Sequence, residues 1–233
     1  VRTKEALNSW IGPTEQVGSN YSDNSPELNK AIKEKGWSHS TSTPGRPQTN
    51  GIAERCVRTI KEGTRCNLIQ SGFNRRKWWS YASRHHCFAR NINRDSGDSA
   101  HLLRHKDNFK GHVIPFGAMV DYMPTPLPDQ RQGSIEEKTK IGLFLGYHLL
   151  PGGIWHGDYL VADFADLQLD PDLGPAVQFV SGARVHRTKE VWTKSEDVFK
   201  FPLGEYKENQ KETIPEPVLD ECPASEPVTV IPD

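Results

Sequence analysis

One long amphipathic segment constrains the fold of this chain more than any other feature. From about Thr49 to Ser71 the sequence carries two stripes at helical spacing. The first stripe is apolar or small and consists of Ala53, Val57, Ile60, Thr64 and Leu68. The second stripe consists of Glu54, Arg58, Lys61 and Arg65. Because residues three, four and seven positions apart share one side of a helix, the pattern predicts a long helix, which Gly72 ends.

Shorter helical and strand patterns surround this helix. Helices are expected at residues 3–11, 25–36 and 76–92, and short strands at residues 16–22 and 37–43. The many aromatic residues of the segment 76–92 favour packing in a core over base stacking. From about residue 113 the pattern changes to short β segments separated by Pro and Gly, at residues 114–122, 141–148, 159–164 and 183–192.

Charge is distributed unevenly along the chain, although the formal net charge is only -1. Residues 33–110 hold sixteen Lys or Arg against six Asp or Glu, whereas residues 200–233 hold three against eight. A basic block of this size indicates either a polyanionic partner or a solvated helical surface, and charge alone does not separate the two. The mean hydropathy is -0.68, and no apolar run approaches the roughly 20 residues that cross a bilayer. None of the four cysteines forms a Cys-x-x-Cys pair, which argues against a zinc knuckle.

Two motifs near the N-terminus carry a resemblance to a known family. The first is the turn Ser22-Asp23-Asn24, and the second is Pro44-Gly45-Arg46-Pro47-Gln48-Thr49-Asn50-Gly51-Ile52-Ala53-Glu54-Arg55. Together they resemble the second half of a retroelement integrase core. Three downstream segments resemble the β-rich region that follows a copia-type core, namely residues 116–122, 141–147 and 158–161. Over roughly residues 1–200 the chain is therefore similar to a copia-type retrotransposon integrase.

The resemblance implies an α/β fold with three parts. Residues 1–110 would be the C-terminal part of an RNase H-like catalytic core, truncated at its start, and residues 113–200 would be a small antiparallel β unit. Residues 201–233 are rich in Glu and Pro and are expected to form a disordered acidic tail or linker. In the intact parent enzyme the core performs metal-dependent polynucleotidyl transfer, in which 3′-hydroxyls of the element DNA attack target phosphodiesters.

Asp23 and Glu54 match the second and third carboxylates of the catalytic triad in this family. Such carboxylates hold Mg²⁺ or Mn²⁺, which activates the attacking oxygen and stabilises the leaving one. Each residue also has a purely structural explanation, Asp23 as a turn residue and Glu54 as a favourable charge at a helix N-terminus. The two are a few residues closer in sequence than is usual in the family, and the first Asp of the triad has no counterpart in this chain. The chain alone is therefore expected to be catalytically inert.

The charged stripe of the long helix matches the DNA-facing side of the catalytic helix in related integrases. Arg58 and Lys61 stand one and two turns after Glu54, where the family contacts the DNA end, and Arg65 continues the stripe. Arg46 and Gln48, in the loop before the helix, are further candidates for DNA contact. Phosphate contacts of this kind supply affinity and salt dependence. The alternative is a solvated face on which these cations form ion pairs with Glu54.

The resemblance also implies partners and a location. The expected partner is DNA, both the element ends and the target, within a Pol polyprotein that includes a reverse transcriptase. An integrase homo-oligomer is compatible with this assignment, and a membrane partner is not expected. The location would be intracellular, and nuclear during action on chromosomal DNA. Two other functions stay open: an inactive or co-opted remnant that still binds nucleic acid, and a purely structural or interaction protein.

Overall fold

A computed structural model describes residues 2–43, 50–93, 97–124, 138–166, 184–194 and 198–212. Its helices are α1 (Arg2–Ile11), α2 (Pro26–Lys35), α3 (Gly51–Ser71), α4 (Arg75–Ile92), α5 (Ala100–His105) and α6 (Pro202–Glu212). Its strands are β1 (Ser19–Ser22), β2 (Ser38–Thr41), β3 (Met119–Tyr122), β4 (Lys140–Leu150), β5 (Ile154–Asp163), β6 (Val185–Thr188) and β7 (Val191–Trp192). The fold is mixed α/β, as expected, and only α5 and α6 have no counterpart among the expected elements.

The first strands form a small parallel unit with one helix between them. β1 and β2 pair in parallel, with Ser19 opposite Ser38, and α2 makes the crossover. The Ser25 side chain accepts a hydrogen bond from the amide of Leu28, and Pro26 occupies the first turn, so the start of α2 is capped as its sequence predicts. Gly36 ends the helix in the left-handed conformation. The sequence therefore fixes both ends of the helix that separates the two strands.

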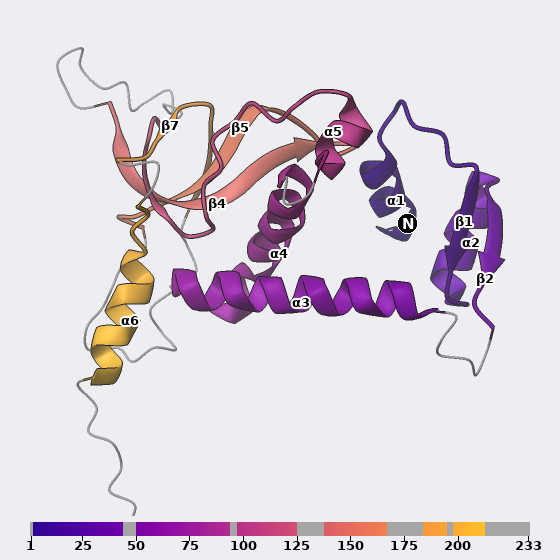
Figure 1. Ribbon diagram of the computed structural model, residues 1–233, viewed down its shortest axis with the longest axis horizontal. Helices are drawn as coiled ribbons and strands as arrows, with labels where there is room; N and C mark the ends of the chain where they lie inside the picture. Colours follow the sequence, from indigo (N-terminus) through magenta and orange to yellow (C-terminus); the bar gives the residue numbers. More distant parts are fainter. Residues whose placement is uncertain are drawn as a thin grey trace, which may run out of the picture.

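The second sheet is antiparallel and strongly curled. Its strand order is β6-β5-β4-β3-β7, so β6 and β7 lie at opposite edges. The last residue of β6 is Thr188 and the first of β7 is Val191, and three residue steps span at most about 11 Å. The two edges must therefore approach each other, which closes the sheet toward a barrel (Figure 1). This confirms the expected antiparallel β unit.

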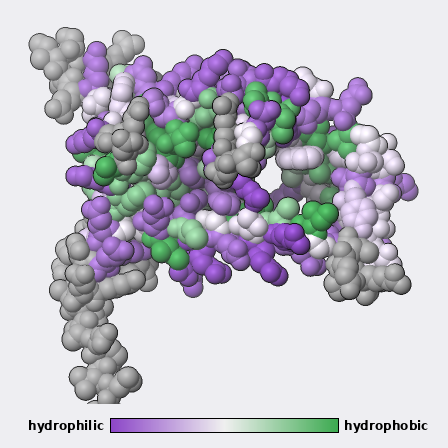
Figure 2. All heavy atoms as spheres, in the orientation of Figure 1, coloured by the Kyte–Doolittle hydropathy of each residue, from purple (hydrophilic) through white to green (hydrophobic). Residues whose placement is uncertain are grey.

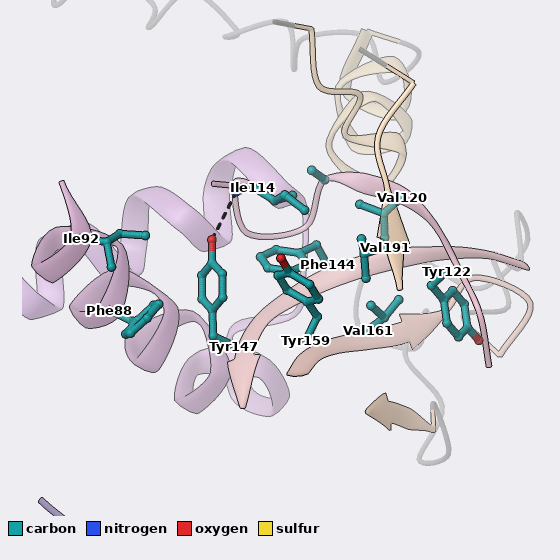
Figure 3. Close-up of a cluster of buried hydrophobic side chains, with 11 residues drawn as sticks. Phe88, Ile92, Ile114, Val120, Tyr122, Phe144, Tyr147, Tyr159, Val161 and Val191 are labelled. Carbon is teal, nitrogen blue, oxygen red and sulfur yellow. Dashed lines mark hydrogen bonds between the residues drawn. The ribbon is translucent and has the colours of Figure 1, made fainter. Parts of the chain in front are cut away.

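Both faces of this sheet are covered, because side chains of β4 point to both sides. An irregularity in β4 between Phe144 and Gly146 interrupts the strict alternation, and Phe144 and Tyr147 pack in one cluster with Phe88 and Ile92 of α4 (Figure 3). The residues that form the second cluster come from α3, the α3–α4 turn, α4, the β strands and α6, and include Leu68, Phe73, Trp78, Leu143, Leu145 and Leu203. Helix α4 therefore packs with the strands after residue 113 in both clusters, and α3 packs with them in the second.

The expected disorder of residues 201–233 is wrong for the first part of that segment. Residues 202–212 form α6, and Leu203 is only 1% exposed within the second cluster. A Cβ placed on Gly72 would meet the carbonyl of Leu203 at 2.4 Å, so α6 begins directly against the end of α3. One buried leucine and this close approach outweigh the polar composition that predicted disorder. Residues 213–233 lie outside the described part of the chain.

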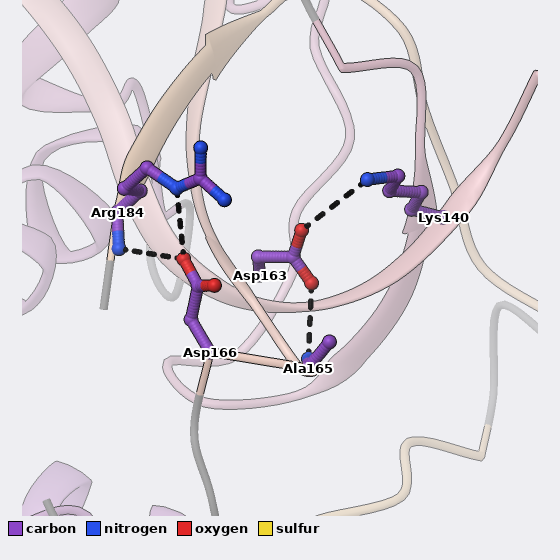
Figure 4. A network of polar contacts seen from close by, with 5 residues as sticks. All are labelled: Lys140, Asp163, Ala165, Asp166 and Arg184. Atoms are coloured by element: carbon purple, nitrogen blue, oxygen red, sulfur yellow. Dashed lines mark hydrogen bonds and ion pairs between the residues drawn. The ribbon is translucent and has the colours of Figure 1, made fainter. Parts of the chain in front are cut away.

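A polar network fixes the ends of the sheet strands. The Asp166 carboxylate accepts hydrogen bonds from the Arg184 amide at 3.1 Å and from its Nε at 3.2 Å (Figure 4). Asp163 accepts from the amide of Ala165 at 3.0 Å and lies 3.9 Å from the ammonium of Lys140. The hydrogen bond from the Arg184 backbone amide, followed by the one from its side chain, lowers the pKa of Asp166. The network therefore holds the end of β5 beside the start of β6.

Helix α1 connects the parallel unit to the curled sheet. The carbonyl of Ser9 accepts a hydrogen bond of 2.8 Å from the amide of Gly152, in the turn between β4 and β5. Arg104 of α5 donates to Glu15 at 2.7 Å and to the carbonyl of Trp10 at 2.7 Å. Helix α3 extends from the parallel unit toward the curled sheet (Figure 1).

Candidate nucleic-acid interface

A groove of about 970 Å³ lies between the parallel β1–α2–β2 unit and the N-terminal two thirds of α3. Figure 2 shows the molecule hollowed beside this half of α3, with hydrophilic residues along the lower edge where α3 lies. Both carboxylates singled out in the sequence, Asp23 and Glu54, line this groove. Three cations of the charged stripe line it as well, namely Arg58, Lys61 and Arg65. The motif residues from two separate elements therefore meet at one surface.

Asp23 is placed by the turn that joins β1 to α2. The Ser22 hydroxyl donates to the carbonyl of Asp23 at 2.8 Å and lies 2.8 Å from Nε2 of His39, on the neighbouring strand. Because the hydroxyl has one proton to donate, it accepts from Nε2–H of His39. On the other side of the turn, Asn29 of α2 donates to the Asn24 side chain at 2.9 Å. The turn is thus tied to both flanking elements, and Asp23 itself stays exposed at the groove.

Glu54 is placed by the start of α3. It stands in the first turn of the helix, where the unpaired backbone amides favour a negative charge. Asn50 precedes the helix but its side chain makes no capping hydrogen bond. Glu54 is exposed and faces the groove. The structural explanation of Glu54, as a partner of the helix dipole, therefore holds together with its place in the candidate site.

Three cations of α3 form no ion pair with a described residue, although a third carboxylate, Glu62, lines the same groove. Among the described residues, no carboxylate lies within ion-pair distance of Arg58, Lys61 or Arg65, and the six ion pairs present lie elsewhere. The alternative, in which Glu54 pairs with the cations that follow it, is therefore not what the structure contains. Exposed cations that no ion pair engages can contact the phosphates of a polyanion.

The groove also has an apolar side, which the charged motif residues did not predict. Tyr21, Ile52 and Val57 line it, and these three side chains are 56%, 85% and 50% exposed. Ala53 and Val57 belong to the apolar stripe of the long helix, whereas Leu68 at the other end of the stripe is 6% exposed. The sequence showed the stripe but not that its first half would lie open. Arg46 and Gln48 lie outside the described residues.

The donors for a divalent cation fit the expected metal in type. Asp23 and Glu54 offer carboxylate oxygens, which Mg²⁺ and Mn²⁺ prefer. No group of three or more His, Cys, Asp or Glu residues that could enclose a metal occurs in the described ranges. The adjacent His85, His86 and Cys87 do not form such a group either, since the His85 ring is engaged with the Ile114 carbonyl at 2.9 Å. The two carboxylates at the groove would supply oxygen ligands to such a metal, and water would fill its remaining positions.

Comparison with family models finds no match for this chain. Within the described residues, no helix is both long and apolar enough to cross a membrane.

Proposed function

We propose that this chain is part of a copia-type retrotransposon integrase and that its α3 groove is a DNA-binding surface. The single observation that carries the proposal is the composition of the groove: Asp23, Glu54 and three cations of α3 that form no ion pair with a described residue line one hollow, together with Glu62. The two residues that match the integrase carboxylates thus lie beside the cations that match its DNA contacts. Purely structural roles for these residues supply no reason for them to share a surface.

We also propose that the first part of the chain is RNase H-like, on the basis of its sequence motif and its order of elements. The parallel β1–α2–β2 unit followed by a long helix is the order of elements that such a core requires at its end. The apolar first half of α3 is open to solvent, as expected for a helix whose covering sheet is incomplete in the described residues. Both features support the proposal, and the motif in the sequence carries the family assignment.

In this proposal, nucleic-acid binding and phosphodiester transfer depend on different residues. Asp23 and Glu54 would hold Mg²⁺ or Mn²⁺, which supplies charge stabilisation for phosphodiester transfer when a third ligand completes the site. The residues of α3 orient the nucleic acid through its phosphates, which requires no metal. Nucleic-acid binding through these cations is therefore expected whether or not this chain can cut. The DNA partner, the polyprotein context and action in the nucleus belong to this proposal as well.

The test is DNA binding by the full chain across a salt series. Fluorescence anisotropy with a labelled duplex would compare the wild type with Arg58→Glu/Lys61→Glu. If each cation neutralises one phosphate, the log–log salt slope of the wild type exceeds that of the double variant by about 1.8. At low salt the double variant should lose most of its affinity, because it also introduces two repulsive charges.

The matched control reverses two exposed cations that do not line the groove. Arg55→Glu/Arg90→Glu changes the net charge by the same amount, with Arg55 on α3 and Arg90 on α4. The proposal expects this control to keep most of the wild-type salt slope. Equal losses in both double variants would show a binding mode that depends only on net charge, and the groove assignment would be rejected.

A further inference from the structure

A second hollow continues the cationic face of α3 beyond the groove. It measures about 600 Å³ and lies where the end of α3, the start of α4 and α6 meet. Arg75, Arg76 and Lys207 line it, with Glu208 as the one carboxylate among its lining residues. Ile69, which also lines it, stands four positions after Arg65, the last cation of the first groove. Since residues four apart lie on one side of a helix, the two hollows follow the same side of α3.

The two arginines of this second hollow are exposed and uncompensated. Neither Arg75 nor Arg76 has an ion-pair partner among the described residues, and both side chains are open to solvent. They stand in the first turn of α4, where the helix dipole already places positive potential and the Asn74 side chain caps the amide of Arg76 at 2.9 Å. This arrangement is electrostatically unfavourable for the helix alone, and a bound anion relieves it.

An exposed aromatic residue accompanies the two arginines. Trp79 is 59% exposed, whereas its neighbour Trp78 is 4% exposed in the core. Trp79 follows Arg75 by four positions and Arg76 by three, so the indole lies on the same side of α4 as the two guanidinium groups. Cations beside an open aromatic ring are the combination with which proteins hold nucleic-acid strands, through phosphate contact and stacking.

We propose that the DNA-binding surface continues past Arg65 to the start of α4, where Arg75 and Arg76 bind backbone phosphates and Trp79 stacks on an unpaired base at the end of the duplex. α3 has 21 residues and is about 30 Å long, so the track from Glu54 to Arg76 matches the length of about nine base pairs. This inference rests on the proposed function of the first groove, and it assigns a second contact region to the same nucleic acid.

The experiment extends the salt series to the start of α4 in the full chain, with the same labelled duplex carrying a single-stranded overhang as probe. Arg75→Gln/Arg76→Gln should lower the salt slope by about 1.8, because two phosphate contacts are lost. Arg75→Lys/Arg76→Lys keeps both charges and should keep the slope. Trp79→Leu should weaken binding without changing the slope, because stacking releases no counterions. Circular dichroism of each variant checks that the helices remain folded.

The outcomes separate this inference from the proposed function. If Arg75→Gln/Arg76→Gln has the wild-type slope while Arg58→Glu/Lys61→Glu has a lower one, the track ends at Arg65 and the inference is overturned alone. If neither double variant changes the slope, both proposals fail. An unchanged affinity of Trp79→Leu overturns the stacking contact. A reduced slope in both double variants, with weaker binding by Trp79→Leu, supports the continuous track.

Discussion

At the scale of single residues, His85 shows that burial in the core holds a histidine ring neutral and fully hydrogen-bonded. The sequence places it in the run His85-His86-Cys87, yet the structure buries its ring between α3, α4 and the segment before β3. Nδ1 accepts a hydrogen bond from the Asn67 amide group at 3.4 Å, and Nε2–H donates to the Ile114 carbonyl at 2.9 Å. These contacts use the neutral ring, and burial lowers the pKa of His85 below its ordinary value.

This lowered pKa predicts a loss of stability in acid. In the unfolded chain His85 takes up a proton near pH 6.5, whereas in the folded chain it does so only at a lower pH. The free energy of unfolding should therefore be pH-independent with respect to His85 above about pH 6.5 and should fall as the pH drops below it. Urea unfolding at a series of pH values measures this decline.

The variant His85→Phe isolates the contribution of this one ring. It should unfold more easily at neutral pH by about 1–3 kcal/mol, because the Ile114 carbonyl loses the His85 donor and the Asn67 amide keeps only the Ala82 carbonyl as acceptor. Its decline between pH 6.5 and 5 should be shallower than that of the wild type, with the rest due to His86, His105 and His186, whose pKa values are also lowered by burial. An unchanged decline would assign the acid sensitivity to those other groups.

Residue-level prediction from sequence succeeded where spacing determines the answer and failed where packing does. The aromatic residues of α4 were expected in the core, and Trp78 and Phe88 are there, each 4% exposed. Trp79 is not, because adjacent residues on a helix point about 100° apart. Aromatic density alone does not tell which neighbour faces the core, since that depends on the partner elements.

At the scale of elements, the sequence of α3 predicted which residues share one face of the helix but not which of them are covered. Its apolar stripe was predicted residue by residue, and Thr64 and Leu68 are buried as expected. Val57, on the same stripe, is half exposed at the groove. A sequence predicts which residues share a helical face, whereas the coverage of that face depends on distant segments that the pattern does not specify. The contact between α6 and the end of α3 escaped prediction for this reason.

The two glycines that end α2 and α3 allow that contact to be measured. Gly36 and Gly72 both adopt left-handed conformations, with φ of 69° and 73°. An alanine Cβ at Gly36 meets nothing within 4 Å, whereas at Gly72 it meets backbone atoms of Leu203 and Gly204. Gly36→Ala should therefore cost about 1–2 kcal/mol from the backbone conformation alone. Gly72→Ala should cost clearly more, because α6 must move.

Chemical denaturation of both glycine variants tests this difference. If the two variants lose equal stability, α6 does not dock against the end of α3. In that case the original expectation of a disordered segment from residue 201 would hold in solution.

At the scale of the whole molecule, the order and type of the elements followed from the sequence, whereas their assembly did not. The strands after residue 113 were expected, but not that α4 would share its core with them. This packing arises from contacts between residues far apart in the chain. The candidate site was more predictable, because the motif residues Asp23 and Glu54 already stood out, and the structure places both at one groove.

The most direct test of this groove is lysine footprinting of the full chain with and without duplex DNA. Lys61 lines the groove, whereas Lys189 is exposed between β6 and β7 and serves as the internal reference. Acetylation of each lysine, read by mass spectrometry, reports its accessibility in the same sample. We predict that saturating DNA protects Lys61 strongly and leaves Lys189 unchanged. Equal acetylation of Lys61 with and without DNA would contradict the assignment of the α3 groove as the nucleic-acid interface.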